Sequence, residues 1–318
     1  MNEKRVMGRP SFGLGRRLSV TACTALVIVV VAALFGSIAC ERQASSDKLT
    51  VVTTIFPLAD FVKNVAGDKV DVVTLLRAGD SPHTYEPSSR DMKAVARATI
   101  LVVNGAGLDF WVERLKAAAS DNLVVVDTSA ALAEEGLLLS GGDHDDEGGV
   151  NPHYWLDPVL AQKQVETIAS ALAAADPDNR DFYLENTADY VSQLHSLDEE
   201  IKGVTQSFSS REFITFHPAW TYFAKRYELV EAAVIEEAPG KEPTSKEQMW
   251  IIDLVKELNV KAIFAEPQFS TKAADTIADG SGAKVLLLDP IGGGDLPGRD
   301  SYIALMRYNV GQMAEAMQ

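Results

Sequence analysis

The sequence predicts an α/β protein with two Rossmann-like lobes, each built on a parallel sheet, joined by one long rigid helix. Two observations predict this architecture. Strand-like and helix-like segments alternate from residue 49 onward, which is typical of parallel sheets covered by helices. The alternation stops once, over residues 177–208, where apolar side chains from Phe182 to Val204 recur every three or four positions without an interior proline. It then resumes and continues to the C-terminus.

The first lobe is expected over residues 49–176. It opens with the apolar, β-branched segment LTVVTTIF, followed by a helix with Pro57 in its first turn. The segments VDVVTLLRAG, TILVVNGAG and NLVVVDTS are predicted as further strands. Ser88 and Asp91 match a capping box and predict the start of a helix. Another helix is expected between about residues 110 and 119.

The linking helix predicted over residues 177–208 would be about 45 Å long, as long as a small domain. Such a helix is suited to joining two lobes. The second lobe, residues 209–318, repeats the logic of the first. REFITFH, KAIFAEPQ and AKVLLLDP are predicted strands, and TSKEQMWIIDLVKELN is a helix capped by Thr244 or Ser245. SYIALMRYNVGQMAEAM is the expected closing helix.

The N-terminus is expected to direct export. Residues 1–40 combine a basic start, an apolar run and small residues before Cys40, which is the pattern of a bacterial lipoprotein signal peptide. Cys40 would carry the lipid, and residues 41–48 would tether the domain to the membrane. A retained membrane anchor is the alternative, because the apolar run is about long enough to span a bilayer. Both interpretations predict an exported protein, in the periplasm or at the cell surface.

Cysteine content and charge restrict the kinds of site and partner that the exported part can have. Cys23 and Cys40 both lie in the N-terminal segment, so the remainder has no thiols for a disulfide or a thiolate metal site. The net charge is −16. Residues 1–39 carry five basic side chains and one acidic side chain, which leaves the remainder near −20. Such a chain repels nucleic acid and attracts cations, so no nucleic-acid partner is expected.

Three of the five histidines, and one aspartate, lie next to proline at the edges of predicted elements. They are His83, His153, His217 and Asp289. His83, His217 and Asp289 each follow an apolar strand at its carboxyl end, where ligands bind in open α/β sheets. Three imidazoles and a carboxylate meeting between two lobes would make a tetrahedral site suited to Zn²⁺. Taken singly, each has an ordinary alternative, namely a solvated loop histidine or a turn aspartate.

Six segments, occurring in this order, resemble the zinc/manganese solute-binding proteins of ABC importers, the TroA-like cluster of metal receptors. They are PHTYEPSSRD, NPHYWLDP, YLENTADYVSQLHSLDEEIK, FITFHPAWTYFAKRY, IFAEPQFS and LLLDPIGG. The resemblance extends from about residue 49 to the C-terminus, and the first two motifs together are specific. It implies two α/β lobes bridged by one long helix, with one metal ion between them. Carried over position by position, it implies His83, His153, His217 and Asp289 as the metal ligands.

The resemblance also bears on which metal is bound. Manganese-selective members often have a carboxylate at the third ligand position, where this chain has His217. A third imidazole favours Zn²⁺ over Mn²⁺. We therefore predict one Zn²⁺ per chain, with Mn²⁺ as the alternative.

Two further features lie around the predicted ligands. Glu86 and Glu266 are candidates for orienting them, because metal-binding histidines commonly donate their second N–H to a carboxylate. A salt bridge at a helix end or between the lobes is an equal alternative for both residues. Zinc members often carry a histidine-rich loop before the second ligand, but the loop here, GGDHDDEGG, has only His144. A solvated linker is therefore preferred over an auxiliary zinc site.

The predicted function is a non-enzymatic receptor that captures Zn²⁺ outside the cytoplasm and delivers it to an ABC permease. The chain lacks a GxxxxGK[ST] loop, so the ATPase must be a separate subunit. We expect a monomer. A manganese or iron receptor is the nearest alternative. A zinc hydrolase is a weaker one, because the chain lacks an H-E-x-x-H helix, and a metal-dependent adhesin has no direct support in the sequence.

Overall fold

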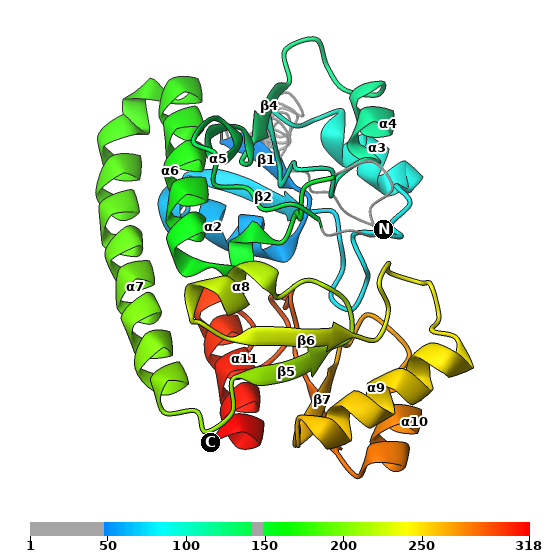
Figure 1. Cartoon of the computed structure of the whole chain (residues 1–318). Helices are drawn as coiled ribbons and strands as arrows, with labels where there is room; N and C mark the ends of the chain where they lie inside the picture. Colours follow the sequence, from blue (N-terminus) through cyan, green and yellow to red (C-terminus); the bar gives the residue numbers. More distant parts are fainter. Residues whose placement is uncertain (1–47, 142–148) are drawn as a thin grey trace, which may run out of the picture. The chain divides into compact units, whose positions relative to one another are not determined.

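The computed structural model describes residues 48–141 and 149–318, and Lys48–Gln318 form one compact unit. Two parallel four-stranded sheets, each flanked by helices, confirm the predicted fold class (Figure 1). The predicted signal peptide with Cys40, the tether up to residue 47, and His144 lie outside the described residues.

The first sheet has the order β2-β1-β3-β4 and the second the order β6-β5-β7-β8. The strands of the first sheet are β1 (Leu49–Thr53), β2 (Val70–Thr74), β3 (Ile100–Val103) and β4 (Val124–Asp127). Those of the second are β5 (Glu212–Thr215), β6 (Val230–Val234), β7 (Ala262–Ala265) and β8 (Lys284–Leu287). All pairings are parallel, with Leu49 opposite Val70 in the first sheet and Ala262 opposite Lys284 in the second. The two lobes therefore share one topology, although no internal repeat is visible in the sequence.

Ten α-helices are described within residues 48–141 and 149–318. In the first lobe they are α2 (Phe56–Ala66), α3 (Ser89–Val95), α4 (Val112–Lys116), α5 (Ala130–Glu134) and α6 (Pro158–Ala175). The linking helix is α7 (Arg180–Gln206), and α8 (Thr221–Arg226), α9 (Ser245–Glu257), α10 (Lys272–Ser281) and α11 (Tyr302–Met317) follow. Short 3-10 helices, η1 (Tyr154–Leu156) and η2 (Pro177–Asn179), precede α6 and α7.

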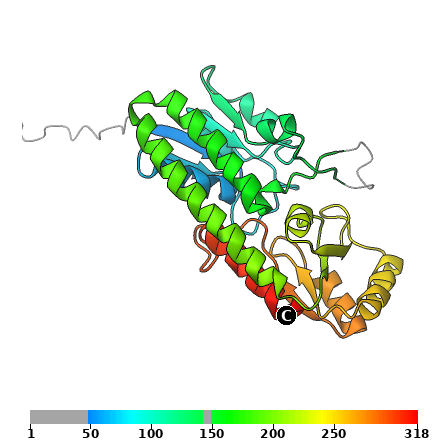
Figure 2. The same cartoon turned by 60° about the vertical axis from the view of Figure 1, so that its left-hand side comes forward.

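The linking helix α7 has 27 residues, which corresponds to about 40 Å. It packs against α2 and α6 of the first lobe and against α11, so it runs along both lobes (Figure 2). At the N-terminal end of α7, the residues that form the buried face differ from those expected from the sequence. Phe182 and Leu184 are partly exposed, whereas Tyr183 and Tyr190 are buried. Both tyrosine hydroxyls donate to buried or capping carboxylates, Asp176 and Asp60, which makes their burial favourable.

One apolar cluster extends through both lobes. It joins side chains of α2, α6 and α7 to side chains of α8, α11 and the second sheet, for example Phe61, Leu194, Phe223 and Met306. In the described part of the chain, no helix has both the length and the apolarity needed to cross a membrane.

Local sequence signals were accurate where the side chain and its partner are close in sequence. Ser88 with Asp91, and Thr244 with Glu247, both form the reciprocal hydrogen bonds of a capping box. The helix expected over residues 110–119 is shorter, because α4 covers only Val112–Lys116. Strand β6 was not predicted, because Glu231 interrupts its short apolar run.

Candidate metal centre

His83 lies in the loop between β2 and α3, and the backbone around it is anchored at both ends. The Trp111 indole N–H donates to the Pro82 carbonyl over 3.1 Å. At the far end, the capping box of α3 closes the loop, with the Ser88 amide donating to Asp91 Oδ2 over 2.7 Å. A rigid loop loses little entropy when its imidazole binds a ligand.

His153 lies just before η1, and Asn151 controls the orientation of its ring. Asn151 Oδ1 accepts the His153 backbone N–H over 3.0 Å and lies 2.9 Å from His153 Nδ1. With the proton on Nδ1, the lone pair of Nε2 is free for a metal. The Asn151 amide also donates to the Pro218 carbonyl over 2.8 Å, so it ties this loop to the one that follows His217. Sequence reasoning assigned no role to Asn151, although it stands directly before the Pro-His pair.

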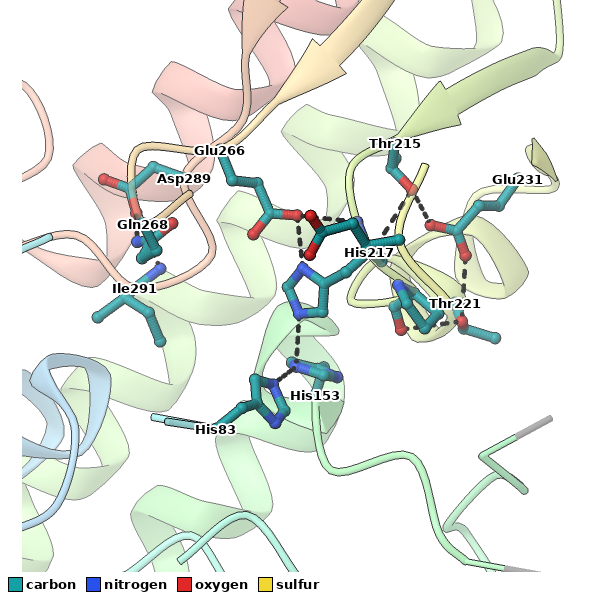
Figure 3. A network of polar contacts seen from close by, with 12 residues as sticks. His83, His153, Thr215, His217, Thr221, Glu231, Glu266, Gln268, Asp289 and Ile291 are labelled. Atoms are coloured by element: carbon teal, nitrogen blue, oxygen red, sulfur yellow. Dashed lines mark hydrogen bonds and ion pairs between the residues drawn. The ribbon is translucent and has the colours of Figure 1, made fainter. Parts of the chain in front are cut away.

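His217 follows β5, and its ring is held by a buried carboxylate. Its Nδ1 lies 2.6 Å from Oε1 of Glu266, which follows β7 and is 1% exposed (Figure 3). A carboxylate in this position fixes the proton on Nδ1 and makes the ring a better metal ligand through Nε2. Glu266 therefore has the geometry expected of an orienting residue.

The three imidazoles converge through their Nε2 atoms. The Nε2 atom of His153 lies 3.0 Å from that of His83 and 3.2 Å from that of His217. One ring nitrogen from each of the three lies within 4.8 Å of the others. Nitrogen ligands in a tetrahedral zinc site lie about 3.3 Å apart, given Zn–N bonds of about 2.0 Å. The spacing of these nitrogens is therefore close to the spacing that a bound Zn²⁺ needs.

The surroundings of His83 and His153 favour the neutral form of both rings. Burial lowers the pKa of His83 to about 3, with a further contribution from neighbouring His217. Burial also lowers the pKa of His153 well below its usual value, and both neighbouring rings act in the same direction. At neutral pH the rings of His83 and His153 therefore hold no extra proton, and their Nε2 lone pairs are available to a cation.

Asp289 does not join the three histidines in the structure. Figure 3 shows it beside Gln268 and Ile291, apart from the imidazoles. Its Oδ2 lies 2.8 Å from Arg299 Nη1. Its Oδ1 accepts three N–H groups, from Gln268, Ile291 and Gly292, over 2.9 to 3.0 Å. Its place as a metal ligand remains a prediction, and sequence reasoning did not identify Arg299 as its partner.

Glu86 lies away from the histidine rings. Its side chain is exposed and lines a surface pocket with Arg77, Asp80 and Thr84. Among the described residues, no hydrogen bond joins its carboxylate to a histidine. Of the two predicted orienting carboxylates, the structure brings only Glu266 to a ligand ring.

The histidine cluster is reached from solvent through a pocket of about 430 Å³. Loops from both lobes line it, including Leu108 and Val150 from the first and Pro218 and Pro239 from the second. The cluster thus lines a pocket between the lobes together with loop residues of both.

A family model described as "Zinc-uptake complex component A periplasmic", ZnuA, matches residues 51–316. The chain belongs to the ZnuA family. This confirms the predicted resemblance to metal-binding proteins of ABC importers.

Individual relatives of this ZnuA-family chain are named for two metals. It is 32% identical over 314 residues to the high-affinity zinc uptake system protein ZnuA of Bacillus subtilis (strain 168), covering 94% of this chain and 96% of that protein. It is 30% identical over 296 residues to the manganese-binding lipoprotein MntA of Halalkalibacterium halodurans, covering 91% and 96%. A crystal structure of ZnuA matches with a TM-score of 0.76 at 35% identity, covering 85% of this chain and 99% of that chain. The choice of metal for this ZnuA-family member must therefore be argued from its own ligands.

Proposed function

We propose that this protein is an extracytoplasmic receptor that captures one Zn²⁺ on His83, His153 and His217 and delivers it to an ABC permease. The observation that carries the proposal is the convergence of three imidazole Nε2 atoms, one of them backed by the Glu266 carboxylate, in a pocket between the lobes. A separate ATPase subunit supplies the energy for import, and Cys40 carries the lipid that anchors the receptor, as a monomer, to the membrane.

The ligand chemistry supports zinc over manganese. Three neutral imidazoles are ligands of intermediate softness, which suit Zn²⁺, whereas Mn²⁺ prefers carboxylate, carbonyl and water oxygens. The third imidazole is His217, and its partner Glu266 strengthens it as a nitrogen donor.

Asp289 is the proposed fourth ligand. It follows β8 at the carboxyl edge of the second sheet, the same edge that presents His217. In coordinating the ion, its Oδ2 would exchange the Arg299 contact for the metal. Four protein ligands would leave no open position for an activated water, which is the arrangement of a carrier rather than a hydrolase.

The test is a comparison of His217→Ala with His195→Ala. His195 is exposed on α7 and is not one of the three clustered histidines, so it makes a matched control for losing one imidazole. We expect His217→Ala to weaken Zn²⁺ binding by more than about 100-fold, since a lost ligand costs at least as much as a lost partner of a ligand. His195→Ala should bind as the unaltered protein does.

Chelator competition gives the affinities, and metal analysis of protein purified without added metal gives the stoichiometry. Unchanged binding in His217→Ala would refute the site. Preferential retention of Mn²⁺ when both ions compete would refute the choice of zinc.

A further inference from the structure

Asp289 forms an ion pair with Arg299, and a positively charged side chain is unusual beside a proposed cation site. The Asp289 side chain is 1% exposed and that of Arg299 is 21% exposed, and a single hydrogen bond of 2.8 Å joins them. Arg299 lies over the Tyr308 ring of α11, with its guanidinium carbon 5.0 Å from the ring centroid. The guanidinium is therefore held in place from two sides, in the lobe that supplies His217.

The two oxygens of Asp289 are held very differently. Oδ1 accepts from the amides of Ile291 and Gly292 and from the Gln268 side chain. Oδ2 has only Arg299 as a partner among the described hydrogen bonds. The backbone of Asp289 is also fixed, because its N–H and carbonyl both bond to the Asn309 side chain, over 2.8 and 2.7 Å. Oδ2 is thus the oxygen that can turn to an ion, and Arg299 is the group that competes for it.

The competition is between one hydrogen bond and one metal–oxygen bond. Arginine binds a carboxylate most strongly through two parallel N–H groups, but here only Nη1 contacts Asp289, and the buried Nε–H has no partner in the described structure. Such a contact can be displaced, yet its positive charge still opposes a nearby cation. The contact thus weakens the oxygen ligand without removing it.

We propose that Arg299 determines metal selectivity by holding Oδ2 of Asp289 and so reducing the share of oxygen in the coordination of the ion. This inference rests on the proposed function, in which the three histidines bind the metal. An ion that binds mainly to imidazoles, such as Zn²⁺, loses little when the carboxylate ligand is weakened. Mn²⁺ depends more on oxygen ligands and loses more.

The experiment measures Zn²⁺ and Mn²⁺ affinities of the full exported chain with Arg299→Met, which removes the charge and keeps a flexible apolar side chain over Tyr308. We expect the affinity for Mn²⁺ relative to Zn²⁺ to rise by about tenfold. In an Asp289→Asn background, the same Arg299→Met change should leave the ratio unaltered, since no second carboxylate oxygen remains to be released. Arg299→Lys, which keeps the charge, should stay near the unaltered ratio.

Two outcomes would overturn the proposal. The first is an unchanged ratio of Mn²⁺ to Zn²⁺ affinity in folded Arg299→Met. The second is an equal rise of this ratio in the Asp289→Asn background, which would mean that the charge of Arg299 acts without Asp289. If Arg299→Met does not fold by circular dichroism, Tyr308→Leu tests the same idea. It loosens the guanidinium and should shift the ratio in the same direction, and no shift would again overturn the proposal. The His217→Ala titration tests the metal site separately. Unchanged Zn²⁺ binding in that variant would refute the site itself. Weakened Zn²⁺ binding there, together with an unchanged metal ratio in Arg299→Met, would refute only the role of Arg299.

Discussion

Two of the three histidines in the metal centre depend on a neighbour that fixes the position of a proton. Glu266 does this for His217, and Asn151 does it for His153. Each neighbour binds Nδ1 and leaves Nε2 facing the other rings. These two candidate ligands are thus each paired with an orienting residue, which reduces the reorganisation needed when an ion arrives.

Asp109 shows how single residues also shape the mouth of the pocket. Its Oδ2 accepts the Gly105 N–H over 2.8 Å and holds the loop after β3, which includes the pocket-lining Leu108. Gly105 has a φ of +78° and lies so close to Asp127 that a Cβ atom would clash with it. The loop therefore requires glycine there, and it requires a hydrogen-bond acceptor at Asp109.

We predict that Asp109→Asn stabilises the metal-free protein more at pH 8 than at pH 5. Burial raises the pKa of Asp109 from 3.8 to about 6, and neighbouring Asp127 adds to this. The folded state then binds this proton more tightly than the unfolded state, so ionised Asp109 costs stability increasingly as the pH rises from about 4 through 6. Asparagine keeps an acceptor without the charge. The gain should be larger at pH 8 by about 1 kcal/mol, measured by urea unfolding at both pH values. Equal gains at the two pH values would contradict the assignment.

At the level of whole elements, the start of helix α3 helps to position one candidate ligand, His83. The capping boxes of α3 and α9 have the same chemistry, but only the one at Ser88 closes a loop that carries a metal-centre histidine, His83. The cap at Thr244 begins a helix in the second lobe, and the preceding loop carries none of the three histidines.

We predict that Ser88→Ala and Thr244→Ala each lower the free energy of unfolding by about 1 kcal/mol, the usual cost of losing an N-cap side chain. Only Ser88→Ala should also weaken Zn²⁺ binding, because a frayed α3 leaves His83 less ordered before binding. Denaturant unfolding and chelator competition on the same two variants separate the effects. A loss of affinity in both variants, or in neither, would argue against the role assigned to the α3 cap.

At the scale of the whole described unit, the two lobes share one apolar cluster. The apolar cluster that includes Phe61, Leu194 and Phe223 is continuous from the first lobe through α7 to the second. A large hinge movement would have to break contacts in this cluster. We therefore expect release of the ion to depend on the loops at the pocket rather than on wide opening of the lobes.

The shared core predicts a single unfolding transition. Trp111 reports on the first lobe and Trp220 on the second, and both are fully buried. In two variants that keep Trp111 or Trp220 as the single one of the chain's four tryptophans, urea unfolding followed by fluorescence should give the same midpoint. Clearly separated midpoints would show that the lobes unfold independently, and would contradict the argument that the shared apolar cluster prevents a large hinge movement.

Much of this arrangement is predictable from the sequence because its signals are local. The strand and helix alternation, the two capping boxes and the proline-flanked histidines all depend on residues a few positions apart. The prediction was less accurate where tertiary packing decides. Tyr183 and Tyr190 take the buried face of α7 in place of Phe182 and Leu184, because carboxylates outside the helix accept their hydroxyls, Asp176 just before it and Asp60 far away in sequence.

The sequence by itself, including its family resemblance, determined the fold class, the three histidines and the preference for an imidazole-rich metal site. Only the tertiary structure decided which groups hold those residues. Glu266 reaches His217 across 49 positions of sequence, and Arg299 reaches Asp289 from ten positions further along the same loop, between β8 and α11. The physical reason is that a periodic pattern reports which side of an element is buried, whereas a hydrogen bond between loops depends on the path of the whole chain. The proposed share of Asp289 in binding the ion therefore depends on the folded protein, through a guanidinium that no motif in the sequence marks.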